Sequence, residues 1–464
     1  MLDRVVTQLA REQERAVERL CDLLRIPSVS TDPNYAGDCA RAAEWVAGQL
    51  RECGLGVEVH PTAGHPVVLG RYDGAGPHAP RLLLYGHYDV QPPDPVEKWT
   101  TPPFEPTIRD GRIYARGASD DKGQFMCFVE ALRAWRSAGD APPIHVTVLI
   151  EGEEESGSAN LESFLVEHKA QLAADVAAIS DTAMWDRDTP AITYGLRGLL
   201  YFDVQLHGPN RDLHSGVYGG TVPNPATELV LALGRLFDAR HRVTIPGFYD
   251  DVAPVTKQER SRWAALNFDE QSYAQSLGLR MLRGEQGFST LERRWARPSC
   301  DINGLYGGYM GEGAKTVIPS FAGAKVSFRL AAGQDPRKVE HDFRNWLQGQ
   351  TPPGCKWRVT QLGAAHPVAV ATDTPFMAAA CRAVEAGFGR PPVLIREGAS
   401  IPVVATFKST LGIDTLLIGL GLNDDNLHSP DEKFEVESFH RGCRVYASLL
   451  AELADTARRS SGSA

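Results

Sequence analysis

The spacing of apolar residues divides the first 180 residues into helical and extended segments. A helical repeat predicts helices over residues 4–24, 38–53, 122–138 and 161–171. Short, continuous apolar runs predict strands over residues 57–60, 67–72, 82–85, 144–150 and 176–179. Because strands alternate with helices, we expect an α/β fold with a mostly parallel sheet sandwiched by helices.

The pattern changes near residue 194 and changes back near residue 375. In between, residues 195–207 and 315–330 alternate as long strands do, and residues 224–238 and 336–348 have helical spacing. Afterwards the pattern predicts helices over 375–388, 401–410 and 436–455 and strands over 393–395 and 415–418. The simplest organisation is one α/β domain in two parts, residues 1–193 and 380–464, interrupted by an α+β domain over residues 194–379.

Composition narrows the class of protein. The chain has 464 residues, enough for two or three domains, and a formal net charge of −10, which argues against a nucleic-acid surface. We expect no membrane span, because no apolar run approaches about 18 residues. The eight cysteines are scattered and form no Cys-x-x-Cys pair, so we expect a reduced, cytoplasmic protein.

The strand predicted over residues 82–85 ends in a candidate metal ligand. After Gly86 come His87 and Asp89, two residues apart. In an extended chain both side chains point to the same side, where Asp89 can accept a hydrogen bond from the ring nitrogen of His87 that is not used for metal. A surface histidine is the alternative interpretation of this motif taken alone.

Four further segments carry ligand-type side chains after apolar runs or in glycine-bounded turns. They are residues 116–123 with Asp120 and Asp121, residues 151–157 with four glutamates, Ser180-Asp181, and residues 426–430 with His428. Helix capping by the two aspartates and a solvated turn at the glutamates are the alternatives. Clustered glutamates directly after a buried strand, however, need a compensating cation.

The carboxyl ends of parallel strands meet at one edge of a sheet, so we expect these segments to form one site. Two histidines and several carboxylates without thiolates suit zinc, with manganese or cobalt also possible. They are too many for one tetrahedral ion, and two ions about 3.5–4 Å apart, bridged by one carboxylate, would use them. Such a pair activates a water and polarises a carbonyl, and a spare glutamate can carry the proton, so the sequence predicts a two-metal hydrolase.

Taken together, these motifs resemble those of the M20 family of metallopeptidases, most of all its dipeptidase branch. The resemblance covers nearly the whole chain. It rests on residues 86–92, 116–123, 151–158, 192–198, 212–216, 315–319, 396–402 and 428–429. One departure is Glu153, which stands where an apolar residue is common in the family.

The resemblance implies a metal ligand set. His87 would bind one metal ion and His428 the other, and Asp120 would bridge both. Glu155 would complete one coordination sphere and Asp181 the other.

The resemblance also implies how the site works. Glu154 would be the general base, and Asp89 would orient the histidine at position 87. A cis peptide bond is expected between Asp120 and Asp121.

The inserted domain resembles the family's lid and dimerisation domain, which implies a homodimer. His214 would reach into the neighbouring subunit's site and help polarise the scissile carbonyl. Arg329 would hold the substrate carboxylate, with Thr316 and Ser400 as further contacts and Glu397 at the site wall. Without the resemblance, each of these residues would be interpreted as an ordinary turn or strand-end polar residue.

The residue type at position 181 distinguishes branches of the family, because aspartate at this position is typical of aminopeptidases and dipeptidases. We therefore expect cleavage of dipeptides or similar small amides. An N-acyl amino acid deacylase or desuccinylase is the alternative within the fold. A catalytically silent metal-binding protein is the alternative of another class.

Overall fold

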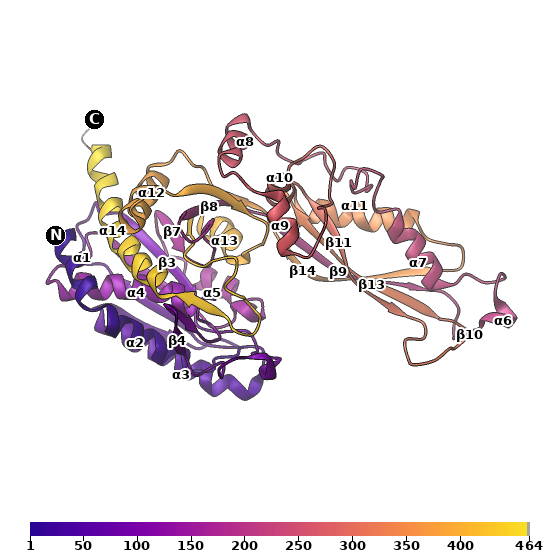
Figure 1. Ribbon diagram of the computed structural model, residues 1–464, viewed down its shortest axis with the longest axis horizontal. Helices are drawn as coiled ribbons and strands as arrows, with labels where there is room; N and C mark the ends of the chain where they lie inside the picture. Colours follow the sequence, from indigo (N-terminus) through magenta and orange to yellow (C-terminus); the bar gives the residue numbers. More distant parts are fainter. Residues whose placement is uncertain (462–464) are drawn as a thin grey trace. The chain divides into compact units, whose positions relative to one another are not determined.

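The computed structural model describes residues 1–461. Here the chain forms two compact units, which Figure 1 colours along the sequence. Unit 1 contains residues 1–194, 370–395 and the described residues from 406 onward. Unit 2 contains residues 195–369 and 396–405.

The units divide the chain differently from the predicted domains near the end of the insertion. Residues 370–379, predicted to belong to the insertion, lie in unit 1, and residues 396–405, predicted to belong to the α/β domain, lie in unit 2. The reason for the first difference is α12 (Pro375–Phe388), which buries an alanine- and valine-rich face and packs on α14 (Val436–Ser461). Residues 462–464, the end of the predicted second part, lie outside the described residues.

The sheet of unit 1 has a parallel centre. Its strands run in the order β1 (Gly56–His60), β2 (Val67–Tyr72), β6 (His145–Glu151), β3 (Arg81–His87), β7 (Val176–Ile179), β17 (Thr415–Ile418) and β8 (Ala191–Leu196). The pairs β6-β3, β3-β7 and β7-β17 are parallel. β6, β7 and β17 are buried along their whole length, which indicates that both faces are covered. The predicted α/β fold is confirmed.

Helices of unit 1 cover this sheet: α3 packs on β1 and β2, α4 on β3, and α12 on β17. The helices are α1 (Leu2–Arg11), α2 (Gln13–Leu24), α3 (Ala36–Glu52), α4 (Lys122–Ser137), α5 (Leu161–Glu167), α12 and α14. A small antiparallel sheet, β18 (Lys433–Glu435), β5 (Arg112–Tyr114) and β4 (Thr107–Arg109), completes the unit. No helix in residues 1–461 has the length and hydropathy needed to cross a bilayer.

Gly86 allows β3 to run past the start of α4. A Cβ at this position would lie 2.5 Å from Phe125 Cβ and 2.9 Å from Asp121 Oδ2. No other side chain fits between the strand and the helix without displacing one of them. The glycine before His87 therefore sets how closely this strand end approaches the Asp120-Asp121 turn.

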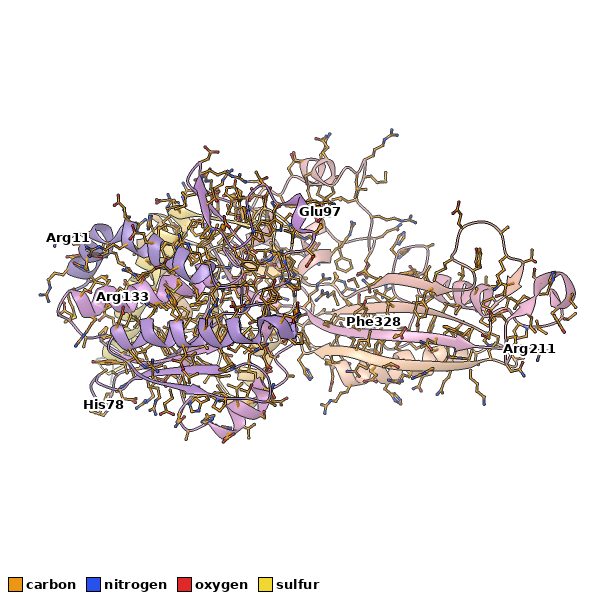
Figure 2. The ribbon with its side chains drawn as sticks, turned by 90° about the horizontal axis from the view of Figure 1, so that it is seen from below. Arg11, His78, Glu97, Arg133, Arg211 and Phe328 are labelled. Carbon is orange, nitrogen blue, oxygen red and sulfur yellow. The ribbon has the colours of Figure 1, made fainter. Side chains whose placement is uncertain are left out.

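Unit 2 is built on a four-stranded antiparallel sheet, with β11 (Ser299–Gly307), β13 (Phe321–Leu330), β9 (Gly198–His207) and β14 (Lys356–Ala365) in that order. Alternate residues of β9 are buried, so one face of the sheet forms the core. The helices α7 (Pro225–Gly234) and α11 (Pro336–Gly349) pack on this sheet. Phe328, labelled in Figure 2, lies fully buried in that core.

The rest of unit 2 consists of short elements. They are β10 (Leu213–His214), α6 (Ser215–Tyr218), α8 (Lys257–Ala264), α9 (Glu270–Ser276), α10 (Thr290–Trp295), β12 (Val317–Ile318) and β15 (Val368–Ala369). β16 (Val393–Glu397) pairs with β8 and leads into residues 396–405, where α13 (Pro402–Thr406) begins.

Four predicted elements are divided in the structure. The helix predicted over residues 4–24 breaks at Glu12, where φ is −103° and ψ is 10°. The strand predicted over 315–330 is interrupted at Pro319, which has no N–H to donate to a ladder. The strand predicted over 195–207 begins anew at Gly198, and the helix predicted over 401–410 turns into a π-helical segment, η4 (Phe407–Leu411).

Candidate metal centre

Three neighbouring strands of unit 1 end beside one another, and candidate ligands follow each of them. β3 ends at His87, and β6 leads into the 3-10 turn η3 (Glu154–Ser156), which carries Glu154 and Glu155. Asp181 lies two residues beyond the end of β7. Because β6, β3 and β7 are parallel neighbours, these side chains meet at the carboxyl edge of the sheet.

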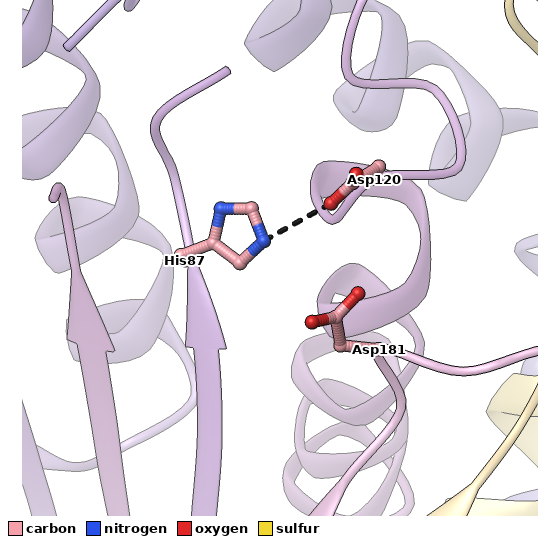
Figure 3. A group of neighbouring side chains, drawn as sticks. All are labelled: His87, Asp120 and Asp181. Atoms are coloured by element: carbon pink, nitrogen blue, oxygen red, sulfur yellow. Dashed lines mark ion pairs between the residues drawn. The ribbon is translucent and has the colours of Figure 1, made fainter. Parts of the chain in front are cut away.

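Figure 3 shows a first group of candidate ligands, His87, Asp120 and Asp181. One possible ligand atom of each residue lies within 4.8 Å of the other two. The fully buried Nε2 of His87 is 3.1 Å from Asp120 Oδ1 but lies outside hydrogen-bond geometry. A buried ring nitrogen that faces two carboxylates in this way is the donor set of a divalent-metal site.

A second group shares Asp120 with the first and adds Glu155 and His428. His428 Nε2 is 3.0 Å from Asp120 Oδ2 and 3.3 Å from Glu155 Oε2. The two oxygens of Asp120 therefore serve different groups, Oδ1 the first and Oδ2 the second. The Asp120–Asp121 peptide bond is cis, as the resemblance implied.

The electrostatics of the two groups favour bound cations. Burial and the carboxylates of Asp120 and Asp121 raise the pKa of Asp181 well above its usual range. Contacts with Asp120 and Glu155 raise the pKa of His428 to about 10. These clustered, buried carboxylates stabilise positive charge close to them. Divalent ions carry such a charge, and carboxylate and imidazole groups are their usual ligands.

Asp89 contacts both the histidine and the glutamate turn. Nδ1 of His87 is 3.0 Å from the backbone oxygen of Asp89 and 3.4 Å from its carboxylate, so the nearer partner is the main chain. The carboxylate oxygens of Asp89 accept from the backbone N–H groups of Glu154, at 3.3 Å, and Glu155, at 3.1 Å. Asp89 thereby fixes the orientation of the His87 ring, and with it the position of Nε2. It also holds the turn that carries Glu155.

The four glutamates at and after the end of β6 have different surroundings. Glu151 accepts hydrogen bonds from the hydroxyls of Tyr85 and Ser158. The second of the four, Glu153, accepts from the side-chain amide of Asn160 and so has a structural task. Glu155 lies against His428 and accepts a hydrogen bond at 2.8 Å from the side-chain amide of Gln91.

Glu154 is the glutamate that none of these contacts engages. Burial raises its pKa to about 7, and the neighbouring carboxylates of Glu155, Asp120 and Asp89 oppose its ionisation further, although His87 acts in the other direction. A carboxyl group poised near neutral pH beside the ligand groups has the protonation behaviour of a general base or acid.

Sequence reasoning missed Glu432, which lies fully buried under the Asp120 loop. Its carboxylate accepts from the backbone N–H groups of Gly117 and Ser119, each at 2.9 Å, and of Asp120 at 3.1 Å. It also pairs with the buried Arg116 at 2.7 Å. The available signal was a charged residue within a short strand-like segment near His428, which by itself indicates no partner.

Unit 2 brings three of the expected substrate contacts near one end of its sheet. Arg329, near the end of β13, donates to Ser400 Oγ at 3.2 Å, and that hydroxyl donates to the backbone oxygen of Arg197. Glu397 is the last residue of β16. Burial raises the pKa of Glu397, and the Arg294 guanidinium acts against that rise.

The other two expected contacts, His214 and Thr316, lie at the opposite end of the same sheet. His214 pairs with the residue after Thr316 in the β10-β12 ladder, and its Nδ1 accepts from Gly216 N–H at 3.0 Å. This ladder adjoins Phe321, where β13 begins, whereas Arg329 lies eight residues further along that strand. At about 3.4 Å per residue, roughly 27 Å of strand separates the two groups.

Known proteins match this chain over most of its length. The family model for peptidase family M20/M25/M40 matches residues 83–452. The Cys-Gly metallodipeptidase dug1 of Schizosaccharomyces pombe is 32% identical over 98% of this chain and 98% of its own length. The Beta-Ala-His dipeptidase of Homo sapiens is 32% identical over 98% of this chain and 93% of its own length.

A solved structure extends the agreement to the fold. The M20 family metallo-carboxypeptidase Sso-CP2 of Sulfolobus solfataricus superposes with a TM-score of 0.86 at 31% identity, covering 95% of this chain and 99% of that one. The three proteins thus match nearly the whole chain, and the family model matches residues 83–452, which include parts of both units. This chain belongs to peptidase family M20/M25/M40.

Proposed function

We propose that this chain is a metal-dependent dipeptidase that uses two divalent ions. The observation that carries the proposal is the position of Asp120, whose two carboxylate oxygens face two separate groups of metal-ligand side chains. One shared carboxylate between two such groups is the arrangement of a two-metal hydrolase. Relatives over nearly the full length are named as dipeptidases, which supports this class of substrate.

The donor set indicates which residues would hold the ions. His87, Asp181 and one oxygen of Asp120 would hold one ion, and the other oxygen of Asp120 with Glu155 and His428 would hold the second. Nitrogen and oxygen donors without thiolates suit Zn²⁺, and Mn²⁺ or Co²⁺ would also fit. When bound, such a pair acidifies a water and polarises the carbonyl of the substrate.

The proton transfers fall to Glu154. It would take a proton from the attacking water and return it to the departing amine, and a pKa of about 7 suits both directions. Asp89 would keep the His87 ring and the turn of Glu154 in register through the contacts described above.

Recognition of the substrate would fall to unit 2. The guanidinium of Arg329, with Ser400 beside it, can hold the carboxylate of a dipeptide in a bidentate fork. Glu397, at the end of β16, would form part of the site wall. Thr316 lies beside His214, at the other end from Arg329, and would therefore contact the carboxylate in the site of a second copy of the chain.

The separation within unit 2 supports a homodimer. A dipeptide places its carboxylate and its scissile carbonyl within a few bonds of each other, yet His214 and Arg329 lie at opposite ends of the sheet. If both act on one dipeptide, the histidine must come from a second copy of the chain. We therefore propose that unit 2 is the dimerisation domain and that His214 polarises the carbonyl in the partner's site.

We also propose that the protein works in the cytoplasm. Seven of its eight cysteines are buried, and none is bridged within residues 1–461. Buried thiols of this kind serve as small core residues in a reducing compartment.

The test is a hydrolysis assay on the metal-reconstituted chain, with a dipeptide library beside a panel of acetyl- and succinyl-amino acids. We expect cleavage of dipeptides, and we expect Glu154→Gln to lower turnover by about 10²–10⁴-fold with metal content unchanged. Glu162→Gln, an exposed glutamate in the first turn of α5, is the matched control and should keep full turnover.

Three outcomes would contradict the proposal. Cleavage of acylated amino acids alone would identify a deacylase or desuccinylase. Undetectable metal together with no amide hydrolysis would identify a binding-only protein. Near-normal turnover in Glu154→Gln would refute the assignment of the base.

A further inference from the structure

Unit 2 contains a cavity that the proposed dipeptide site does not use. Its volume is about 760 Å³, within the range of small-molecule sites. It lies among α9, the loop that follows this helix, α10, the segment after α7 and the first residues of β11. Neither Arg329 nor Ser400 is among its lining residues, although Arg197 is.

The lining of this cavity is rich in arginine. Its charged residues are five arginines and two carboxylates, Arg197, Arg283, Arg293, Arg294, Arg297, Glu285 and Asp301. This excess of positive charge stands out in a chain whose net charge is −10. The local balance therefore favours an anion, in the opposite direction from the protein as a whole.

In the described part of the chain, three of these arginines lack a paired carboxylate, although Asp301 interacts with Arg197 and Glu397 with Arg294 over longer distances. Arg297 forms a bidentate ion pair with Glu285, at 2.7 and 2.8 Å, so that carboxylate is engaged. Within residues 1–461, no ion pair joins Arg197, Arg293 or Arg294 to a carboxylate. Arg197 donates instead to the backbone oxygen of Gly398, at 3.0 Å.

Burial and the neighbouring positive charges change the pKa of Arg197. Burial and the neighbouring guanidiniums of Arg329 and Arg294 lower its pKa to about 10, although Asp301 acts in the other direction. Of these arginines, Arg197 and Arg294 line the cavity, so an anion bound there would offset the repulsion between them and would be held by charge-assisted hydrogen bonds.

The outer wall of the cavity is apolar. Leu277, Leu279 and Met281 line it and are 53%, 49% and 78% exposed, respectively. Phe237 and Val243 line it as well. Large apolar side chains exposed together at the mouth of a cavity mark a surface that gains from being covered, here by the apolar part of a ligand.

We propose that this cavity binds an amphipathic organic anion. Its carboxylate or phosphate head would be held by Arg197, Arg293 and Arg294, and its apolar body would lie against the apolar outer wall. A neutral alcohol could cover the apolar wall but has no charge to pair with the arginines. Inorganic phosphate could pair with the arginines but would leave the apolar wall exposed. The two features together therefore select for a molecule that carries both groups.

The cavity is joined to the expected substrate contacts through Arg197. The backbone oxygen of Arg197 accepts a hydrogen bond from Ser400 Oγ, and that hydroxyl accepts one from Arg329. An anion that shifts Arg197 would therefore shift the pair that holds the substrate carboxylate. This coupling rests on the proposed function, whereas binding in the cavity does not.

Calorimetric titration of the metal-reconstituted protein tests the site. Octanoate and octyl phosphate should bind, each at least about tenfold more tightly than octanol or inorganic phosphate. The relative affinities of octanoate and octyl phosphate identify the preferred head group. Arg293→Gln, and Leu279→Asp at the exposed rim, should each weaken binding about tenfold or more.

Two controls locate the binding. Arg211→Gln removes the same charge from an exposed part of unit 2, at the tip labelled in Figure 2, and should leave binding unchanged. Arg329→Gln should also leave it unchanged if the cavity is the site. Loss of binding in Arg329→Gln with retention in Arg293→Gln would overturn the proposal, because the probe would then occupy the substrate contacts. Equal binding of octanol and octanoate would overturn it as well.

Steady-state kinetics test the coupling separately. Saturating octyl phosphate should change KM for a dipeptide while kcat stays constant, and Arg293→Gln should abolish the change. An unchanged KM would remove the coupling and leave the site in place. A protein that binds octyl phosphate but cleaves no dipeptide would contradict the proposed function and not the site.

Discussion

Glu432 holds the backbone of Asp120 in place, through a hydrogen bond of 3.1 Å that spans 312 positions of the chain. The same carboxylate accepts from the N–H groups of Gly117 and Ser119, so one buried side chain binds three N–H groups of the turn that presents the shared aspartate. A residue remote in sequence thereby fixes where the two carboxylate oxygens of Asp120 point.

Glu432→Gln should weaken metal binding. The amide keeps the size of the side chain but loses the charge that pairs with Arg116, and it can accept at only one oxygen. Changes in groups that orient metal ligands reduce metal affinity about 10–100-fold. Competition with a chromogenic chelator measures this change. Glu437→Gln, at an exposed glutamate five positions away, should keep the affinity of the unchanged chain.

His428→Ala should reduce bound metal from two ions to about one per chain. The other group of ligands, which contains His87 and Asp181, does not depend on His428. The side chain of His428 is 55% exposed, so its removal should leave the fold intact. Elemental analysis after dialysis gives the stoichiometry, and His341→Ala, at a surface histidine of α11, serves as the control. Two retained ions would remove His428 from the ligand set.

Mixed dimers should restore activity to two inactive variants. His214→Ala lacks the histidine that we propose acts in the partner's site, and Glu154→Gln lacks the proposed base. When both chains are co-expressed, a mixed dimer contains one site with Glu154 from one chain and His214 from the other. Random assembly should give roughly a quarter of the wild-type rate.

The homodimeric variants are the controls for this experiment. Each should remain inactive at the same total concentration. If the mixture is no more active than its parts, the histidine does not act across subunits. Normal turnover in the His214→Ala homodimer would show that this histidine has no part in the reaction.

Glu292→Gln should destabilise unit 2 at neutral pH. Burial would raise the pKa of Glu292, but hydrogen bonds from Ser289 and Arg260 lower it below its ordinary value of 4.5. A carboxyl group with a lowered folded-state pKa stabilises the fold above its unfolded pKa and loses that contribution as the pH falls through the folded value. We expect a loss of about 1 kcal/mol in unfolding free energy at pH 7.

The pH dependence distinguishes this charge effect from a packing effect. The difference between Glu292→Gln and the unchanged chain should shrink below about pH 4, where Glu292 itself becomes protonated. Urea unfolding at pH 7 and at pH 3.5 measures both values. An equal difference at the two pH values would show that the ionised carboxylate does not carry the stabilisation.

The strand ends of the metal centre could be predicted from the sequence. Each is marked by a local feature, an apolar run that ends in a histidine or a carboxylate, and parallel pairing brings those ends to one edge without further information. For the same reason His87 and Asp181, which come at the ends of two neighbouring parallel strands, could be expected near one another before any coordinates were known.

Other contacts depend on folding that no local pattern reveals. Among the four glutamates at and after the end of β6, Glu151 and Glu153 are hydrogen-bonded by Tyr85 and Asn160, which reach them from other parts of the fold. Glu432 reaches its partners only once β18 pairs with β5. The cavity in unit 2 is lined in part by α9 and α10. The helices of residues 257–301 have only six to eight residues, which is too short for the apolar spacing to predict them.

The chain passes between the two units four times, after residues 194, 369, 395 and 405. Unit 2 is therefore assembled from two separate stretches, and the shorter one supplies Ser400 to the arginine of the longer one. Exchange of the long stretch alone between relatives would combine a foreign arginine with the native serine. The hydrogen bond between Arg329 and Ser400 therefore joins two separately encoded parts of the chain, and a chimera that exchanges only one of them changes one partner of this contact.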